Sequence, residues 1–136
     1  MAFEIDYWTL RKPGFQAAMG KLARGSGIKD IKARYNIARM TDLMNQEIKT
    51  ANQLFRDLAD QYLAKDEKGV PFKDDDGNWA IADGADKEEF EQKFEEFHNH
   101  KIKIERHLVR LEDIEPVDLS PGDLIELDPI IDQESV

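Results

Sequence analysis

Cysteine is absent from this 136-residue sequence. Without thiols the chain can form neither a disulfide framework nor a zinc site with cysteine ligands. Long apolar runs are absent too, since no stretch approaches the ~20 apolar residues of a membrane-spanning helix. The first residues, 1–13, lack a basic start followed by an apolar segment, so we expect no secretory signal. The sequence therefore predicts a protein made and kept in a cytosol, unless it leaves as part of a particle.

Motifs for nucleophilic catalysis and for phosphate binding are missing as well. The only serines are Ser26, Ser120 and Ser135, and they fall at predicted breaks between elements. No glycine-rich loop follows a predicted strand, as phosphate binding would require. Gly25–Gly27 precedes a helix, where an anion can bind, but a plain linker is the better interpretation. The sequence thus predicts a protein that is not an enzyme and uses no cofactor.

Residues that favour a long α-helix, by contrast, are abundant. Residues 30–65 contain no glycine and no proline, and they are rich in strong helix formers. Asp30 is the predicted N-cap. Apolar residues recur at steps of three or four, which is the repeat of one stripe on an α-helix, and at ~1.5 Å per residue the helix would be roughly 50 Å long. The stripe consists of Ile37, Met40, Met44, Ile48, Ala51, Phe55, Leu58 and Tyr62.

A helix of this length offers more apolar surface than so small a chain is expected to cover alone. Uncapped periodic segments longer than ~25 residues are typical of coiled coils and of helices packed in assemblies. We therefore predict that the stripe is an interaction surface through which the chain forms a homo-oligomer or joins a larger assembly. The predicted interaction residues are Met40, Met44, Ile48, Phe55, Tyr62 and Trp79.

The predicted fold class is α+β, predominantly helical, with one long central helix packed by shorter helices and a small β-hairpin or sheet element. Residues 1–136 are expected to form a single domain. Phe3–Trp8 alternates apolar and acidic residues, as a half-buried strand does. Pro13–Arg24 has the pattern of a short amphipathic helix. The predicted parts are a strand and short helix in 1–27, the long helix in 28–65, an acidic hairpin in 66–84, an aromatic-faced helix in 85–100, and a strand, short helix and tail in 101–136.

The segments that follow the long helix carry three specific expectations. Two apolar pairs, Val70/Phe72 and Trp79/Ile81, should meet across a turn at residues 75–78. The face formed by Phe90, Phe94 and Phe97 should pack antiparallel on the end of the long helix. Residues 112–119 should be extended, Ser120 should cap a helix over 121–127, and residues 132–136 should form a free tail.

Charge is distributed unevenly along the chain, whose net charge is -10. Through Lys65 there are eleven Lys/Arg and seven Asp/Glu, a net of +4; from Asp66 onward there are eight and twenty-two, a net of -14. The asymmetry indicates contact with a charged partner or head-to-tail self-association, while a solvated acidic face explains it almost as well. The basic residues at the start of the long helix are expected to pair with the acidic half of the same chain or of a neighbour; they are Lys29, Lys32, Arg34 and Arg39.

Two candidate metal sites fail on inspection of their spacing. With Gly77 at the sixth position of a calcium loop, Phe72 would occupy the first position, where a carboxylate is required. The histidines His98, His100 and His107 lack a surrounding framework of acidic or histidine ligands. We therefore expect no metal site.

Three stretches carry a resemblance to known proteins. They are FQAAMGKLARGSGIKDIKARYNIARM, the acidic insert KDEKGVPFKDDDGNWAIAD, and the ending LEDIEPVDLSPGDLIELDPII. With this layout the chain resembles small acidic uncharacterised proteins of tailed bacteriophages. The resemblance spans nearly all of the sequence and brings no catalytic residues. It implies a component of the virion or a factor that helps to build it.

Together these observations predict a non-enzymatic bacteriophage structural or virion-assembly protein that acts through contacts with other phage structural proteins. Its expected location is the virion, or the host cytoplasm during assembly, with no membrane association. Direct nucleic-acid binding is not expected, because the overall charge repels DNA. An alternative is an acidic phage-encoded inhibitor that binds a basic surface of a host nucleic-acid enzyme, its carboxylates mimicking phosphates.

Overall fold

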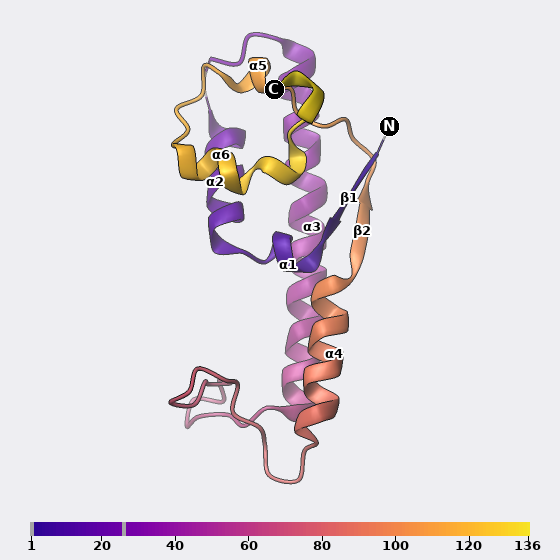
Figure 1. Ribbon diagram of the computed structural model, residues 1–136, viewed down its shortest axis with the longest axis vertical. Coiled ribbons are helices and arrows are strands. Elements are labelled where there is room, and N and C mark those ends of the chain that lie inside the picture. The colour runs from indigo at the N-terminus through magenta and orange to yellow at the C-terminus, as the bar shows by residue number, and fades with distance from the viewer. Residues whose placement is uncertain (1, 26) are drawn as a thin grey trace.

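A computed structural model describes residues 2–25 and 27–136 of the chain, so Ser26 in the predicted linker lies outside the described residues. The chain is organised around α3 (Ile31–Tyr62), one unbroken helix of 32 residues that runs along most of the molecule (Figure 1). The Asp30 carboxylate accepts a hydrogen bond from the Lys32 N–H at 2.8 Å, which confirms Asp30 as the N-cap. The fold is α+β and mostly helical, as the sequence predicts.

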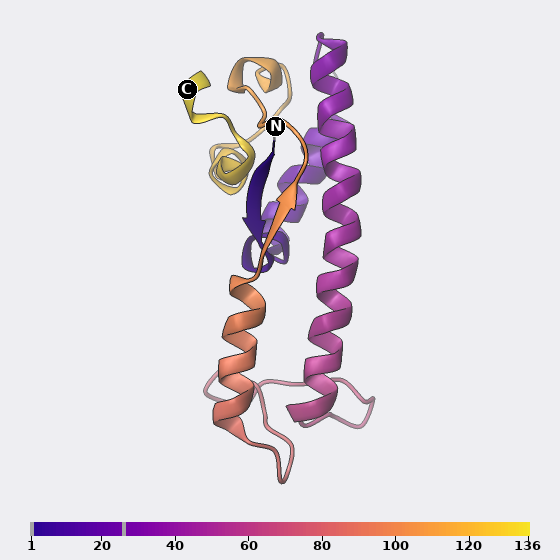
Figure 2. The same ribbon diagram turned by 90° about the vertical axis from the view of Figure 1, so that its right-hand side faces the viewer.

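Around the first half of α3 lies the upper body. Its two strands pair in antiparallel fashion with Phe3 opposite Ile104, and they lie far apart in the sequence. The C-terminal elements lie on the side of the upper body away from α3 (Figure 2). The upper body contains β1 (Phe3–Asp6), α1 (Tyr7–Leu10), α2 (Pro13–Arg24), β2 (Lys101–Ile104), α5 (Leu111–Ile114), α6 (Pro121–Glu126) and the 3-10 helices η1 (Asp128–Ile130) and η2 (Gln133–Ser135).

Three segments of the upper body differ from prediction. The first strand stops at Asp6, because this carboxylate accepts from the Thr9 N–H and begins α1. The segment predicted as extended in 112–119 contains the helical turn α5. The predicted free tail is docked, because the Asp132 N–H donates to the Val109 carbonyl at 2.8 Å and the Ser135 hydroxyl accepts from the Leu111 N–H at 3.0 Å.

The second half of α3 and α4 (Lys87–Asn99) form a stalk below the upper body (Figure 1). The two helices run antiparallel, and the aromatic face of α4 packs on α3 as predicted, with the Phe55 and Phe94 ring centroids 6.0 Å apart. Asp86 caps α4 by accepting from the N–H groups of Glu88 and Glu89.

At the far end of the stalk, residues 63–82 form an irregular ribbon held by isolated bridges. It contains the same turn twice. In the first, the Asp66 carboxylate accepts from the N–H of Lys68 and of Val70. In the second, the Asp74 carboxylate accepts in the same way from residues 76 and 78. The predicted turn is therefore present, but Ile81 pairs with Leu63, which the sequence did not predict, and not across this turn with the pair Val70/Phe72.

Two separate apolar cores result. The upper core lies between α3 and the elements of the upper body and is centred on fully buried side chains; these include Leu10, Phe15, Leu22, Met40, Met44, Ile104, Ile114, Leu127 and Ile130. The lower core, in the stalk, is smaller; its buried members are Ala59, Tyr62, Leu63 and Phe90. Both cores draw on the same apolar stripe of α3.

Candidate interaction surfaces

The predicted interaction stripe on α3 is mostly interior. Met40 has 0% and Met44 has 2% of its surface exposed, because α1 and α2 pack on this side of the helix. Tyr62 is buried in the lower core, where its hydroxyl donates to the Glu89 carboxylate. The prediction that these three residues form an open docking surface is therefore wrong for this conformation of the chain.

The remaining predicted residues are half-buried and also face their own chain. Phe55 and Trp79 pack together in the stalk with their ring centroids 5.7 Å apart. Ile48 packs against the edge of the upper core. Sequence periodicity located the apolar stripe correctly, but it could not reveal that the upper body covers one half of it and α4 with the ribbon covers the other.

Exposed apolar side chains gather elsewhere. Some are adjacent in sequence or in helical spacing, which distinguishes them from the single exposed apolar residues that are normal on protein surfaces. Ile31 and Tyr35 share one face of α3, Leu124 and Ile125 lie on α6, and the others lie in the ribbon, on α1, on α3 and at the C-terminus. The large exposed apolar residues are Trp8, Ile31, Tyr35, Leu54, Val70, Phe72, Leu124, Ile125 and Val136.

The first of these surfaces is the exposed side of the first turns of α3. Ile31 is 70% exposed and Tyr35 is 60% exposed, and the four-residue spacing places them side by side. The Arg106 guanidinium lies 5.4 Å from the centroid of the Tyr35 ring and donates to the Asn36 side chain. We call this surface the α3 basic face; its residues are Lys29, Ile31, Lys32, Arg34, Tyr35 and Arg39.

The four cations of the α3 basic face form no ion pair with any residue of the described chain (2–25 and 27–136). The expected pairing of the basic and acidic halves is represented instead by Lys21 on α2 and Asp123 on α6, 2.8 Å apart. Lys21 lowers the pKa of the Asp123 carboxyl, chiefly through this hydrogen bond. The α3 basic face therefore has its charge directed at solvent.

The second surface is a groove between α5, α6 and the end of the chain, with a volume of about 470 Å³. No Lys, Arg or His occurs in residues 111–136, whereas nine Asp and Glu do. Leu124 lines the groove, and its neighbour Ile125 is 75% exposed. We call this surface the C-terminal groove; it is lined by Leu111, Glu112, Ile114, Glu115, Val117, Leu119, Leu124 and Ser135.

A half-buried cation, Arg11, lies where the stalk meets the upper body. Arg11 donates to the Nε2 atom of His98 at 2.9 Å and stacks 4.2 Å from the centroid of the Phe55 ring. Its Nε–H has no partner within the described residues, and burial lowers the pKa of the guanidinium. Partial burial of a charge without an ion-pair partner reduces the stability of the fold at this junction.

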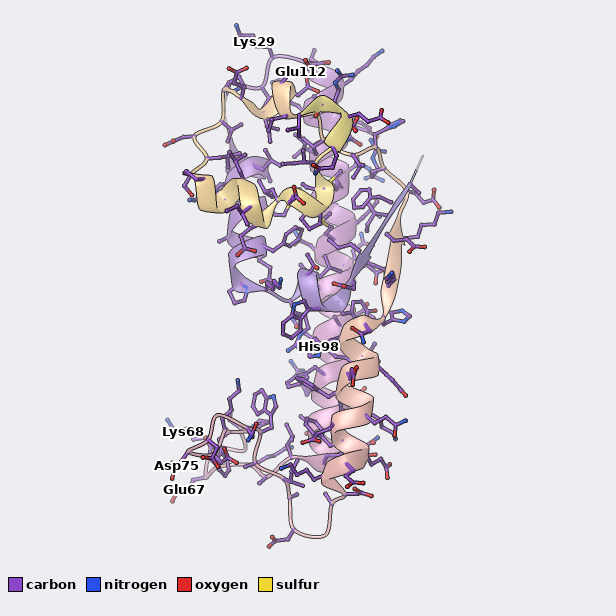
Figure 3. The ribbon with its side chains drawn as sticks, viewed as in Figure 1. Lys29, Glu67, Lys68, Asp75, His98 and Glu112 are labelled. Carbon is purple, nitrogen blue, oxygen red and sulfur yellow. The ribbon has the colours of Figure 1, made fainter. Side chains whose placement is uncertain are left out.

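His98 is the buried partner of Arg11, at the junction shown in Figure 3. Its Nδ1 contacts the Phe94 carbonyl at 3.1 Å, so Nδ1 carries the proton and Nε2 accepts from Arg11. Burial lowers the pKa of His98, and the charge of Arg11 lowers it further. Both ring nitrogens are thus occupied and neither is free to bind a metal.

No group of three or more His, Asp or Glu side chains among residues 2–25 and 27–136 is placed to hold a metal ion. No helix in this part of the chain has both the length and the apolar character to cross a membrane. Comparisons of the chain with protein-family models, with curated proteins and with solved structures give no match.

Proposed function

We propose that the chain is a non-enzymatic structural or assembly protein of a tailed bacteriophage that acts by binding other proteins. The observation that carries this proposal is the pairing of exposed apolar residues into surfaces on a body that already has two closed cores. Contiguous exposed apolar surface is typical of protein–protein interaction sites. The phage setting is supported by the resemblance of the sequence to small acidic phage proteins.

The basis for interaction differs from the one that the sequence suggested. Met40 and Met44 stabilise the monomer from within, so the long helix needs no partner to cover its methionines. The available surfaces are the α3 basic face, the C-terminal groove and the tip of the ribbon. Figure 3 places Lys29 and Glu112 at one extreme of the molecule and Glu67 and Asp75 at the other.

Mass spectrometry of purified particles of the encoding phage tests the proposal. We expect the chain in mature particles, or in assembly intermediates if it acts only during construction. Particles and intermediates that both lack the chain, in a phage that expresses it, would contradict an assembly role. A matched particle preparation from a deletion phage complemented by the wild-type chain is the control.

A second candidate function is inhibition of a host nucleic-acid enzyme by the acidic stalk. On α4, Glu88, Glu95 and Glu96 form no ion pair within the described residues, whereas Lys87 and Lys93 engage Glu91 and Glu89. The ribbon adds the exposed carboxylates of residues 74–76. Such a surface attracts a basic nucleic-acid-binding site by long-range electrostatics.

Binding of the chain to a host polymerase or nuclease, measured as a function of salt, tests this second candidate. Replacing Asp75 and Asp76 by Asn removes charge while leaving Asp74, which holds the turn. Loss of binding in that variant and at high salt supports inhibition. Salt-independent binding, or binding unaffected by the two substitutions and by Glu95→Gln with Glu96→Gln, argues against it.

A further inference from the structure

The α3 basic face and the C-terminal groove are complementary in both charge and polarity. The α3 basic face presents two exposed apolar side chains, Ile31 and Tyr35, among four cations that have no partner in the described chain. The C-terminal groove is apolar within and is bordered by Glu112 and Glu115. Opposite charges around matched apolar contacts favour association and fix its register.

Within one molecule these two surfaces lie on different sides of the upper body. Figure 2 shows α3 on one side of the upper body and α5, α6 and the end of the chain on the other. The exposed side of α3 turns away from the body, because its inner side is occupied by Ile37, Met40 and Met44 of the upper core. Side chains of the exposed side of α3 can therefore enter the groove when the two surfaces belong to different molecules.

We infer that the α3 basic face of one copy docks into the C-terminal groove of a second copy, with Ile31 and Tyr35 entering the groove and the flanking cations meeting its carboxylates. The contact joins two different surfaces, so each copy keeps one surface free for a further copy. A head-to-tail contact of this kind produces a ring if the rotation closes and a filament if it does not. This inference rests on the proposed assembly function and specifies its self-association.

The groove has the size for the inserted side chains. Its volume of about 470 Å³ is within the range of roughly 300–1,000 Å³ that well-formed binding pockets show. Glu112 is held by Arg110 at 2.6 Å, whereas Glu115 forms no ion pair in the described residues. Glu115 is therefore the carboxylate with its charge available to a cation of the second copy.

Two substitutions on exposed residues test the contact without touching the cores. Tyr35→Glu places a negative charge on the α3 basic face, and Leu124→Asp places one in the groove. For each variant alone, the affinity of self-association should fall by about tenfold or more, as it does when a central contact of an interface is removed. Leu54→Glu, on an exposed residue of the same helix outside both surfaces, is the matched control and should associate like the wild type.

A mixture of the two variants gives the decisive result. Tyr35→Glu retains an intact groove and Leu124→Asp retains an intact α3 basic face, so the mixture should form a 1:1 complex that grows no further. Light scattering and sedimentation measure the mass, and circular dichroism confirms that each variant is folded. Raising the salt from about 0.05 M to about 0.5 M should weaken association of the wild type, because salt screens exposed charges.

A wild-type chain that stays monomeric at millimolar concentration would overturn the inference, as would a symmetric dimer that both variants still form. Variants that each associate like the wild type, or a mixture that remains monomeric, would also overturn it. A monomeric chain that is nevertheless found in phage particles would refute this contact while leaving the proposed assembly function in place.

Discussion

The pair formed by half-buried Arg11 and buried His98 makes the stability of the fold depend on pH in a predictable direction. His98 has a lowered pKa in the folded chain, chiefly through burial and then through the charge of Arg11. The unfolded chain therefore binds a proton on this histidine at a higher pH than the folded chain does. The contribution of neutral His98 to the free energy of unfolding is fully present above the unfolded-state pKa of about 6.5. It is lost as the pH falls below that value.

Charged groups around His98 modify this effect of burial. Arg11 faces it from the segment after α1, and Asp6 faces it from the end of β1 and favours the protonated form. Protonation would place two cations 2.9 Å apart, the Arg11 Nη1 to His98 Nε2 distance. One proton changes the unfolding free energy by at most about 1.4 kcal/mol per pH unit.

The assay is urea unfolding between pH 8 and pH 5, comparing the wild type with His98→Gln. At pH 8 the variant should be less stable by about 1–2 kcal/mol, because it loses edge contacts to aromatic rings and keeps weaker hydrogen bonds. Those rings include Phe94, whose centroid lies 4.3 Å from that of the imidazole. The difference in unfolding free energy between the wild type and the variant should shrink as the pH falls, because only the wild type has a histidine to protonate at position 98. Stability curves that stay parallel over the whole range would refute the reasoning.

Three further substitutions have defined outcomes. Met44→Ala should lower the unfolding free energy by about 2–5 kcal/mol in chemical denaturation, because Met44 is fully enclosed in the upper core; a loss below about 1 kcal/mol would contradict that burial. Asp86→Ala should cost about 1 kcal/mol, because α4 loses the side chain that caps two N–H groups; hydrogen exchange should increase in the first turn of α4 and not at the start of α3. Arg11→Met should raise the pKa of His98 measured by NMR, because it removes the nearest positive charge; an unchanged or lower pKa would exclude the contribution assigned to Arg11.

Local signals in the sequence were sufficient for the helices that carry their own caps. Asp30 begins α3 and Ser120 begins α6, and the latter forms a full capping box with Asp123. Pro13 at the first position of α2 and the glycine after Arg24 also mark true boundaries. In each case the hydrogen bonds that define the end lie within a few residues, so the sequence alone contains the information.

Several features that depend on distant partners could not be predicted. The fate of Met40 and Met44 depended on whether α1 and α2 fold back on α3, and no local pattern decides that. The end of the chain is held by bonds to Val109 and Leu111, which a polar sequence at a terminus does not reveal. His98 has a partner 87 residues earlier in the chain, so its buried position was not detectable from the spacing of the histidines.

The turn at Asp74–Asn78 has a practical consequence that follows from its remoteness. Gly77 has a positive φ of 82°, and no neighbouring atom lies within 4 Å of where a Cβ would be. Both chain ends lie in the upper body (Figure 1), at the other extreme of the molecule. If the protein is attached to a surface by one of its ends, a short epitope inserted into this turn would therefore lie far from that surface. Antibody capture of such an insert would show whether that tip is accessible when the protein is bound to its partners.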